Sequence, residues 1–194
     1  MITSLSQLDP AGSYTYGDYL FWKFEERVEL LRGKVRQITA PSRIHQGTNG
    51  NLYRLFANSL WKSSYKVYAA PFDVRLIRFN SEKNKEITTV VQPDICIICD
   101  PEKLDVRGCI GAPDLIVKIL SLGNSKTEMR DKFDLYEEAG VREYWLLHPE
   151  ERTVQIYQLN EAGKYIGLRP FVDDDVVGTA IIPGLMVDFR EVFE

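Results

Sequence analysis

The chain has 194 residues, of which 44% are apolar and 27% are charged. This length and composition are typical of one globular domain and exclude a fibrous or intrinsically disordered protein. No apolar run approaches the roughly 20 residues of a membrane-spanning helix, so the sequence also excludes a membrane protein. The 24 basic and 28 acidic residues give a formal net charge of −4, which argues against coating nucleic acid by charge alone but permits a local basic groove.

The N-terminal segment, MITSLSQLDPAGS, lacks the basic stretch and the apolar core of a secretory signal. We therefore expect a cytoplasmic protein. We predict that residues 1–13 form a flexible lead-in and that residues 14–194 form a single domain.

Helical and extended patterns alternate over the first part of the chain. Thr15 followed by Asp18 predicts a capping box and a short helix. The run ERVELLRGKVRQI predicts a β-hairpin that turns near Gly33. A longer helix is predicted over about 42–62, where apolar residues recur near the helical period.

Three runs of β type follow, over residues 66–79, 87–100 and 112–121. They are rich in Val and Ile with weak alternation, which is typical of central strands covered on both faces. Pro71 interrupts the first run, and residues 80–86 form the only stretch that resembles a loose linker.

A helix is then predicted from Ser125, with Glu128 three residues on as its capping partner, to Gly140. Two more strands are predicted over 142–149 and 153–159, and short strands end the chain. This order predicts an α/β fold bordering on α+β, with one mixed sheet.

The chain has three cysteines, an odd number, and the cytoplasm in which we expect it keeps thiols reduced. Cys96 and Cys99 lie an odd number of positions apart on a predicted strand, so their side chains point to opposite faces. We expect Cys96, Cys99 and Cys109 to be buried apolar thiols, with a zinc or redox site as the alternative.

Lys118 lies in the middle of the apolar run DLIVKIL, where burial of an ammonium is costly without a partner. Asp94 begins the preceding predicted strand. If the two strands are neighbours, positions 94 and 118 lie about 5 Å apart. Two carboxylates at such positions would suit Mg²⁺, which takes one or two protein carboxylates together with waters and phosphate oxygens.

Several motifs, in this order, resemble the Uma-two family of endonucleases: VVQPDICIICD, GAPDLIV, Lys132 followed by Tyr136, and AGVREYWLL. The resemblance runs from about Tyr16 to Leu159. That family belongs to the PD-(D/E)XK superfamily, so the resemblance implies a restriction-endonuclease-like mixed central sheet flanked by helices, with extra β-hairpins. It also implies a homodimer as an expectation, because many such nucleases pair their sites.

The resemblance further implies an active site made of Glu29, Asp94, an acid on the next strand and a lysine. Asp94 and Glu29 would bind Mg²⁺ or Mn²⁺, which activates a water for attack on a DNA phosphodiester. The position of the remaining acid is Lys118 in this chain, and Lys132 takes the place of the lysine. His45 matches a further family position and is expected to contact phosphate or to tune the site.

Lys118 replaces one negative ligand charge with a positive one. The resulting expectation is a metal-dependent DNA endonuclease with reduced or lost activity, in which the Lys118 ammonium pairs with Asp94 and Glu29 in place of the metal. The alternative is an inactive nuclease-fold module that binds DNA or a protein. Lys118 could otherwise extend from the strand to the surface.

Each remaining candidate has a structural alternative. Glu29 could be an exposed hairpin charge, and Asp94 a turn residue at the end of a strand. Lys132 could form a solvated helix pair with Glu128, and His45 could lie on a polar helix face. Asp73 also matches a family position, with a structural role as the favoured interpretation, and Tyr144 and Trp145 are expected in the core or at a dimer interface.

Overall fold

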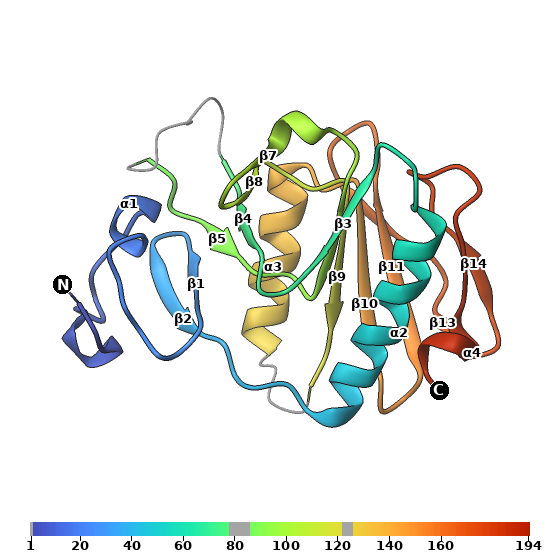
Figure 1. The fold of residues 1–194 in the computed structure, drawn as a ribbon, viewed down its shortest axis with the longest axis horizontal. Helices are drawn as coiled ribbons and strands as arrows, with labels where there is room; N and C mark the ends of the chain where they lie inside the picture. The colour runs from blue at the N-terminus through green and yellow to red at the C-terminus, as the bar shows by residue number, and fades with distance from the viewer. Residues whose placement is uncertain (1, 78–85, 122–125) are drawn as a thin grey trace.

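The computed structural model describes residues 2–77, 86–121 and 126–194 (Figure 1). The two long helices, α2 and α3, flank the strands of a central sheet. None of the helices in these ranges is long and apolar enough to cross a membrane. The described helices are α1 (Tyr16–Tyr19), α2 (Arg43–Ser59), α3 (Lys126–Ala139) and α4 (Phe189–Val192), with the 3₁₀ helices η1 (Leu5–Gln7) and η2 (Pro101–Lys103).

The central sheet has the strand order β12-β11-β10-β9-β6-β3, and β13 also pairs with β11. Strands β9 and β10 are parallel and the other neighbours are antiparallel, so the sheet is mixed. Its strands are β3 (Lys66–Ala69), β6 (Ile95–Ile98), β9 (Leu115–Ile119), β10 (Glu143–His148), β11 (Thr153–Leu159), β12 (Tyr165–Gly167) and β13 (Phe171–Val172).

A second mixed sheet has the order β2-β1-β5-β4-β8-β7. Near the C-terminus, two further strands form an antiparallel hairpin of their own. The strands of the second sheet are β1 (Val28–Leu31), β2 (Lys34–Gln37), β4 (Asp73–Arg75), β5 (Val90–Val91), β7 (Leu104–Asp105) and β8 (Gly108–Ile110), and the hairpin consists of β14 (Val176–Gly178) and β15 (Met186–Asp188).

The mixed α/β class with extra hairpins is confirmed, but the expectation of one sheet is wrong for the described residues. Two predicted runs are each divided between the sheets: β3 and β4 flank Pro71, and β5 and β6 flank Pro93. Proline has no N–H to donate to a ladder. Strand pairing therefore stops at each proline, and the chain passes from one sheet to the other.

Alternate residues of the central strands point to opposite faces of the sheet, and each face packs on one long helix. Ile95 and Val117 belong to an apolar cluster with residues of α2. Cys96 and Ile116 belong to a second cluster with residues of α3. The residues two positions from Cys96 and Ile116, which are 94 and 118, therefore lie on the α3 side of the sheet.

The helix and hairpin predictions are largely confirmed. Thr15 caps α1 with the predicted capping box, and β1 and β2 form the hairpin, in which Gly33 has a positive φ of 82°. Helix α2 ends at Ser59, slightly before the predicted end. Helix α3 ends before Gly140, whose φ of 85° fits the left-handed position. The predicted cap Ser125, the side chain of Glu128 and most of the stretch 80–86 lie outside the described residues.

Residues 2–13 pack against the hairpin of β1 and β2. Ser4 caps η1, and Leu8 is buried in an apolar cluster that includes Val28 and Leu30. The Lys34 ammonium donates hydrogen bonds to the backbone oxygens of residues 11 and 12, at 2.6 and 2.7 Å. The hairpin thus holds this segment by both apolar and polar contacts.

Two of the three thiols are buried as expected. Cys96 and Cys109 are fully buried in the cluster beneath α3, whereas Cys99 is only half-buried, and all three thiols are free. Burial raises the pKa of Cys109 to about 11. Tyr144 and Trp145 are buried, which confirms the expectation that they lie in the core.

Candidate active site

The pairing of β6 with β9 brings Asp94 and Lys118 together. These strands are antiparallel, with Ile95 opposite Val117, so Asp94 and Lys118 are the next pair in the register. The Lys118 Nζ lies 3.0 Å from Asp94 Oδ2. The proximity predicted for positions 94 and 118 is therefore confirmed.

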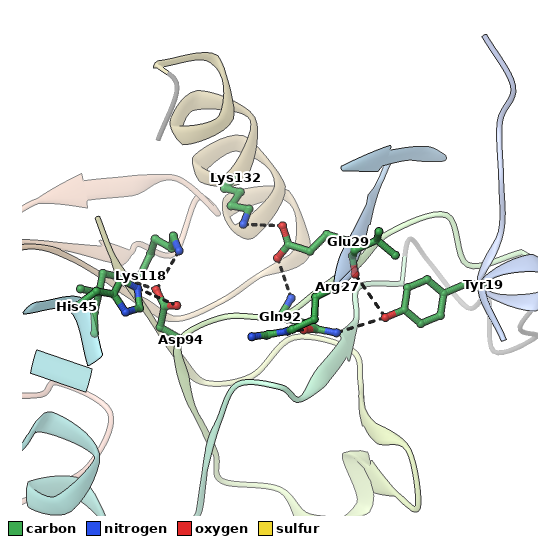
Figure 2. Close-up of polar contacts among 10 residues, drawn as sticks. Tyr19, Arg27, Glu29, His45, Gln92, Asp94, Lys118 and Lys132 are labelled. Atoms are coloured by element: carbon green, nitrogen blue, oxygen red, sulfur yellow. Dashed lines mark hydrogen bonds and ion pairs between the residues drawn. The ribbon is translucent and has the colours of Figure 1, made fainter. Parts of the chain in front are cut away.

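Asp94 has polar partners at both carboxylate oxygens. Oδ2 accepts a hydrogen bond from the backbone N–H of Ile119 at 2.7 Å, in addition to its contact with Lys118. His45, in the first turn of α2, places Nε2 at 3.3 Å from Oδ1. Figure 2 shows His45, Lys118 and Asp94 gathered in one group.

The pKa of Asp94 reflects this environment. Burial by itself would raise the pKa of the carboxyl. The hydrogen bond from His45, the charge of Lys118 and the backbone N–H of Ile119 outweigh burial and hold the pKa below its ordinary value. Asp94 is therefore a carboxylate at neutral pH.

Glu29, on β1, pairs with the second lysine. Its Oε2 lies 2.7 Å from Lys132 Nζ on α3, and its Oε1 accepts a hydrogen bond from the backbone N–H of Gln92 at 2.8 Å. Both charged side chains are buried, with exposed fractions of 4% for Glu29 and 6% for Lys132. The interpretations of Glu29 as an exposed hairpin charge and of Lys132 as a solvated helix residue are therefore wrong.

Lys118 was expected to pair with both Asp94 and Glu29, but the two carboxylates contact different lysines. The structure brings Lys118 to Asp94, whereas Glu29 lies against Lys132. Lys118 does not extend freely to the surface, since only 17% of its side chain is exposed and its ammonium contacts Asp94. His45 is also buried rather than exposed on a polar helix face.

All five predicted site residues line one cavity of about 420 Å³. A cavity of this size is within the range of small-molecule sites. The hairpin, α2, α3 and the ends of β6 and β9 contribute to its wall. Among its described lining residues, the charged side chains are Arg27, Arg36, Lys118, Lys132, Glu29, Asp94 and Asp131.

Gln92 and Arg27 also line the cavity, although they are not among the site residues predicted from the sequence. Gln92 lies two residues before Asp94, and Arg27 lies two residues before Glu29. Alternation along an extended chain places residues two apart on the same face. This alternation was a signal in the sequence that could have identified both.

Asp73 does not line the cavity, but it is connected to it. Its Oδ1 accepts hydrogen bonds from Gln92 Nε2 at 3.0 Å and from the Tyr19 hydroxyl at 3.2 Å. Burial raises the pKa of Asp73, although both hydrogen bonds oppose the shift.

The donor groups do not fit the Mg²⁺ or Mn²⁺ that the resemblance implies. Each of the two carboxylates expected to bind the metal already contacts a lysine ammonium, Asp94 at 3.0 Å and Glu29 at 2.7 Å. Mg²⁺ needs an approach to oxygen of about 2.1 Å, where a nearby ammonium repels it. Within the part of the chain that the structure describes, no group of three or more His, Cys, Asp and Glu side chains could hold a metal ion.

A mixed sheet flanked by helices, with Asp94 and Lys118 at neighbouring strand ends and the pair of Glu29 and Lys132 in the same cavity, is consistent with a nuclease fold of the PD-(D/E)XK type. A family model confirms the class: residues 17–190 match the Uma2 family, whose description is "Putative restriction endonuclease". The chain belongs to this family.

A solved structure has a similar fold. It is described as a "putative nuclease belonging to DUF820" from Anabaena variabilis ATCC 29413. The two chains share 19% identity with a TM-score of 0.70, over 93% of this chain and 97% of the other. No curated protein matches the chain.

Proposed function

We propose that this chain is a nuclease-fold protein that binds DNA at the cavity and has lost most or all metal-dependent cleavage of phosphodiester bonds. The observation that carries the proposal is the contact of 3.0 Å between the Lys118 ammonium and Asp94. This ammonium lies beside the carboxylate that would otherwise face a metal ion.

Charge arithmetic supports the loss of metal binding. At an effective dielectric of about 20, two unit charges 4 Å apart interact by about 4 kcal/mol. Replacement of an acidic ligand by lysine changes the local charge by two units. A change of this size is enough to exclude a divalent cation from the site.

DNA as the ligand is supported by the family and by the cavity. Members of a restriction endonuclease family act on nucleic acid, and the described lining includes two arginines and two lysines against three carboxylates. Lysine and arginine side chains bind phosphate groups of the nucleic-acid backbone. The cavity therefore suits an anionic backbone better than a free metal ion.

Titration calorimetry with Mn²⁺ tests the role of Lys118. We expect no binding by the natural protein and binding by the Lys118→Glu variant, which restores an acid at that position. Lys118→Gln is the matched control, because it removes the ammonium without adding a carboxylate, and we expect it to bind Mn²⁺ more weakly than Lys118→Glu. Mn²⁺ binding by the natural protein, or failure of Lys118→Glu to gain it, would contradict the proposal.

An active metal-dependent endonuclease is the second candidate function. It is favoured by the presence of Glu29, Asp94 and Lys132 in one cavity. Supercoiled plasmid incubated with Mn²⁺ separates the two candidates. Nicking by the natural protein that disappears in Asp94→Ala would favour the active enzyme, whereas nicking only by Lys118→Glu would favour the inactive one.

A further inference from the structure

Gln92 links the candidate site to a second group of polar residues. Its backbone N–H donates to Glu29, and its side-chain Nε2 donates to Asp73 Oδ1 at 3.0 Å and to the Tyr19 hydroxyl at 3.3 Å. Its Oε1 accepts hydrogen bonds from Arg27 Nε at 3.1 Å and Nη2 at 2.6 Å. Figure 2 shows Tyr19, Gln92, Arg27 and Glu29 on one side of the site, opposite the group around Asp94.

Asp73 determines which way the Gln92 amide points. An ionised carboxylate only accepts hydrogen bonds, whereas an amide has an NH₂ that donates and an oxygen that accepts. The NH₂ of Gln92 must therefore face Asp73. The Tyr19 hydroxyl also donates to Asp73, which strengthens this orientation. The amide oxygen is left facing Arg27, where it receives two N–H groups.

Arg27 is thereby held at the cavity although it is exposed to solvent. Its guanidinium has five N–H donors, and Gln92 receives hydrogen bonds from two of its three nitrogens. An arginine that is fixed in this way loses less conformational entropy when it binds an anion. Gln92 thus holds the Arg27 guanidinium in position before a ligand binds.

The hairpin adds a second arginine on the same face. Arg36 lies directly opposite Glu29 in the register of β1 and β2, and cross-strand partners share a face of the sheet. Arg27 lies two residues before Glu29 and also faces the cavity. The two arginines therefore border the cavity on its hairpin side, and the Lys118 ammonium lies near the strand ends.

We propose that Arg27 binds a backbone phosphate of the nucleic acid at the mouth of the cavity, and that Asp73 is a positioning residue that acts on Arg27 through Gln92. This inference rests on the proposed function, because it assigns the contact that would hold DNA. It predicts that DNA lies along the β1–β2 hairpin.

Fluorescence anisotropy with a labelled DNA duplex, repeated over a series of salt concentrations, tests the role of Arg27. The slope of log K against log salt is negative, and loss of one phosphate contact reduces its magnitude by about 1. We expect Arg27→Gln to weaken binding about tenfold at low salt and to reduce this slope accordingly. Arg27→Lys should restore the slope. Arg54→Gln is the matched control, since Arg54 is exposed and paired with Glu191 away from the cavity, and its slope should stay unchanged.

A double-mutant cycle tests the positioning role of Asp73. We expect Asp73→Asn to weaken DNA binding about threefold in the natural protein and not to weaken it further in the Arg27→Gln background. Equal losses in both backgrounds would show that Asp73 acts through general stability, and would overturn its assigned role.

The outcomes separate the two proposals. DNA binding by the natural protein with an unchanged slope in Arg27→Gln would overturn the role of Arg27 and leave the proposed function standing. Absence of DNA binding by the folded natural protein would overturn the proposed function, and the role of Arg27 with it.

Discussion

Among the described residues, two ion pairs join the β1–β2 hairpin to helix α3, with the same distance between their charged atoms but different exposure to solvent. Lys132 contacts Glu29 at 2.7 Å, and Arg32 contacts Glu138 at 2.7 Å. The side chains of the first pair are 6% and 4% exposed, whereas those of the second are 47% and 41% exposed. Distance alone therefore does not distinguish them.

Burial determines what each pair contributes. Two unit charges 4 Å apart interact by about 1 kcal/mol in water and by about 4 kcal/mol at an effective dielectric of about 20. The side chains of the inner pair are almost fully buried, so removal of one partner leaves a buried group that has lost its charged partner. The outer pair keeps its water and is screened by salt. The inner pair also faces the cavity, so its charges are available to a ligand.

The inner pair predicts the largest effect on stability. Lys132→Met should lower the free energy of unfolding by about 3 to 5 kcal/mol, because the buried Glu29 carboxyl would lose its ammonium partner. Urea unfolding at pH 7 measures this change. Adding Glu29→Gln to the same chain should recover part of the loss, and Lys66→Met, at an exposed position of β3, is the control. A decrease in the free energy of unfolding of less than about 1 kcal/mol would show that the buried pair contributes no more than an exposed one.

The pair of Lys118 and Asp94 predicts an intermediate effect. Its side chains are 17% and 11% exposed, and Asp94 keeps its contacts with Ile119 and His45 when Lys118 is replaced. Lys118→Gln should therefore cost about 1 to 3 kcal/mol in the same urea experiment, the range for a buried group that loses one partner. A cost as large as that of Lys132→Met would show that the remaining contacts of Asp94 contribute little.

Acid should reduce the difference between the natural protein and Lys118→Gln. The pKa of Asp94 is lower in the folded state than its ordinary value, so its stabilising contribution is complete above that value and is lost as the pH falls through the folded pKa. Lys118→Gln removes one cause of the low pKa. Urea unfolding at pH 7, 5, 4 and 3 should show the two free energies converging toward low pH. A constant gap would mean that Lys118 acts through packing rather than charge.

The outer pair predicts the smallest effect. Arg32→Ala should change the free energy of unfolding by about 0.5 kcal/mol or less, since exposed pairs are screened by water and salt. Measurements at low and at 1 M salt should differ little for this variant. A loss comparable with that of Lys132→Met would show that the outer contact, and not burial, holds the hairpin on α3.

The sequence by itself determined the local features of this protein. Alternation and capping residues identified most helices and strands, because these signals depend on neighbours a few positions away. The strand pattern also placed Asp94 beside Lys118, since the register of two adjacent strands follows from their apolar faces. The motifs led to the nuclease family that the family model confirms.

Only the tertiary structure decided which lysine meets which carboxylate. Glu29 and Lys132 are separated by about a hundred positions, and their contact depends on how α3 docks on the hairpin. The division of the strands between two sheets, and the contacts of Gln92 with Arg27 and Asp73, likewise depend on long-range packing. A local sequence pattern cannot predict which charged residues will pair, because burial and distance are properties of the folded chain.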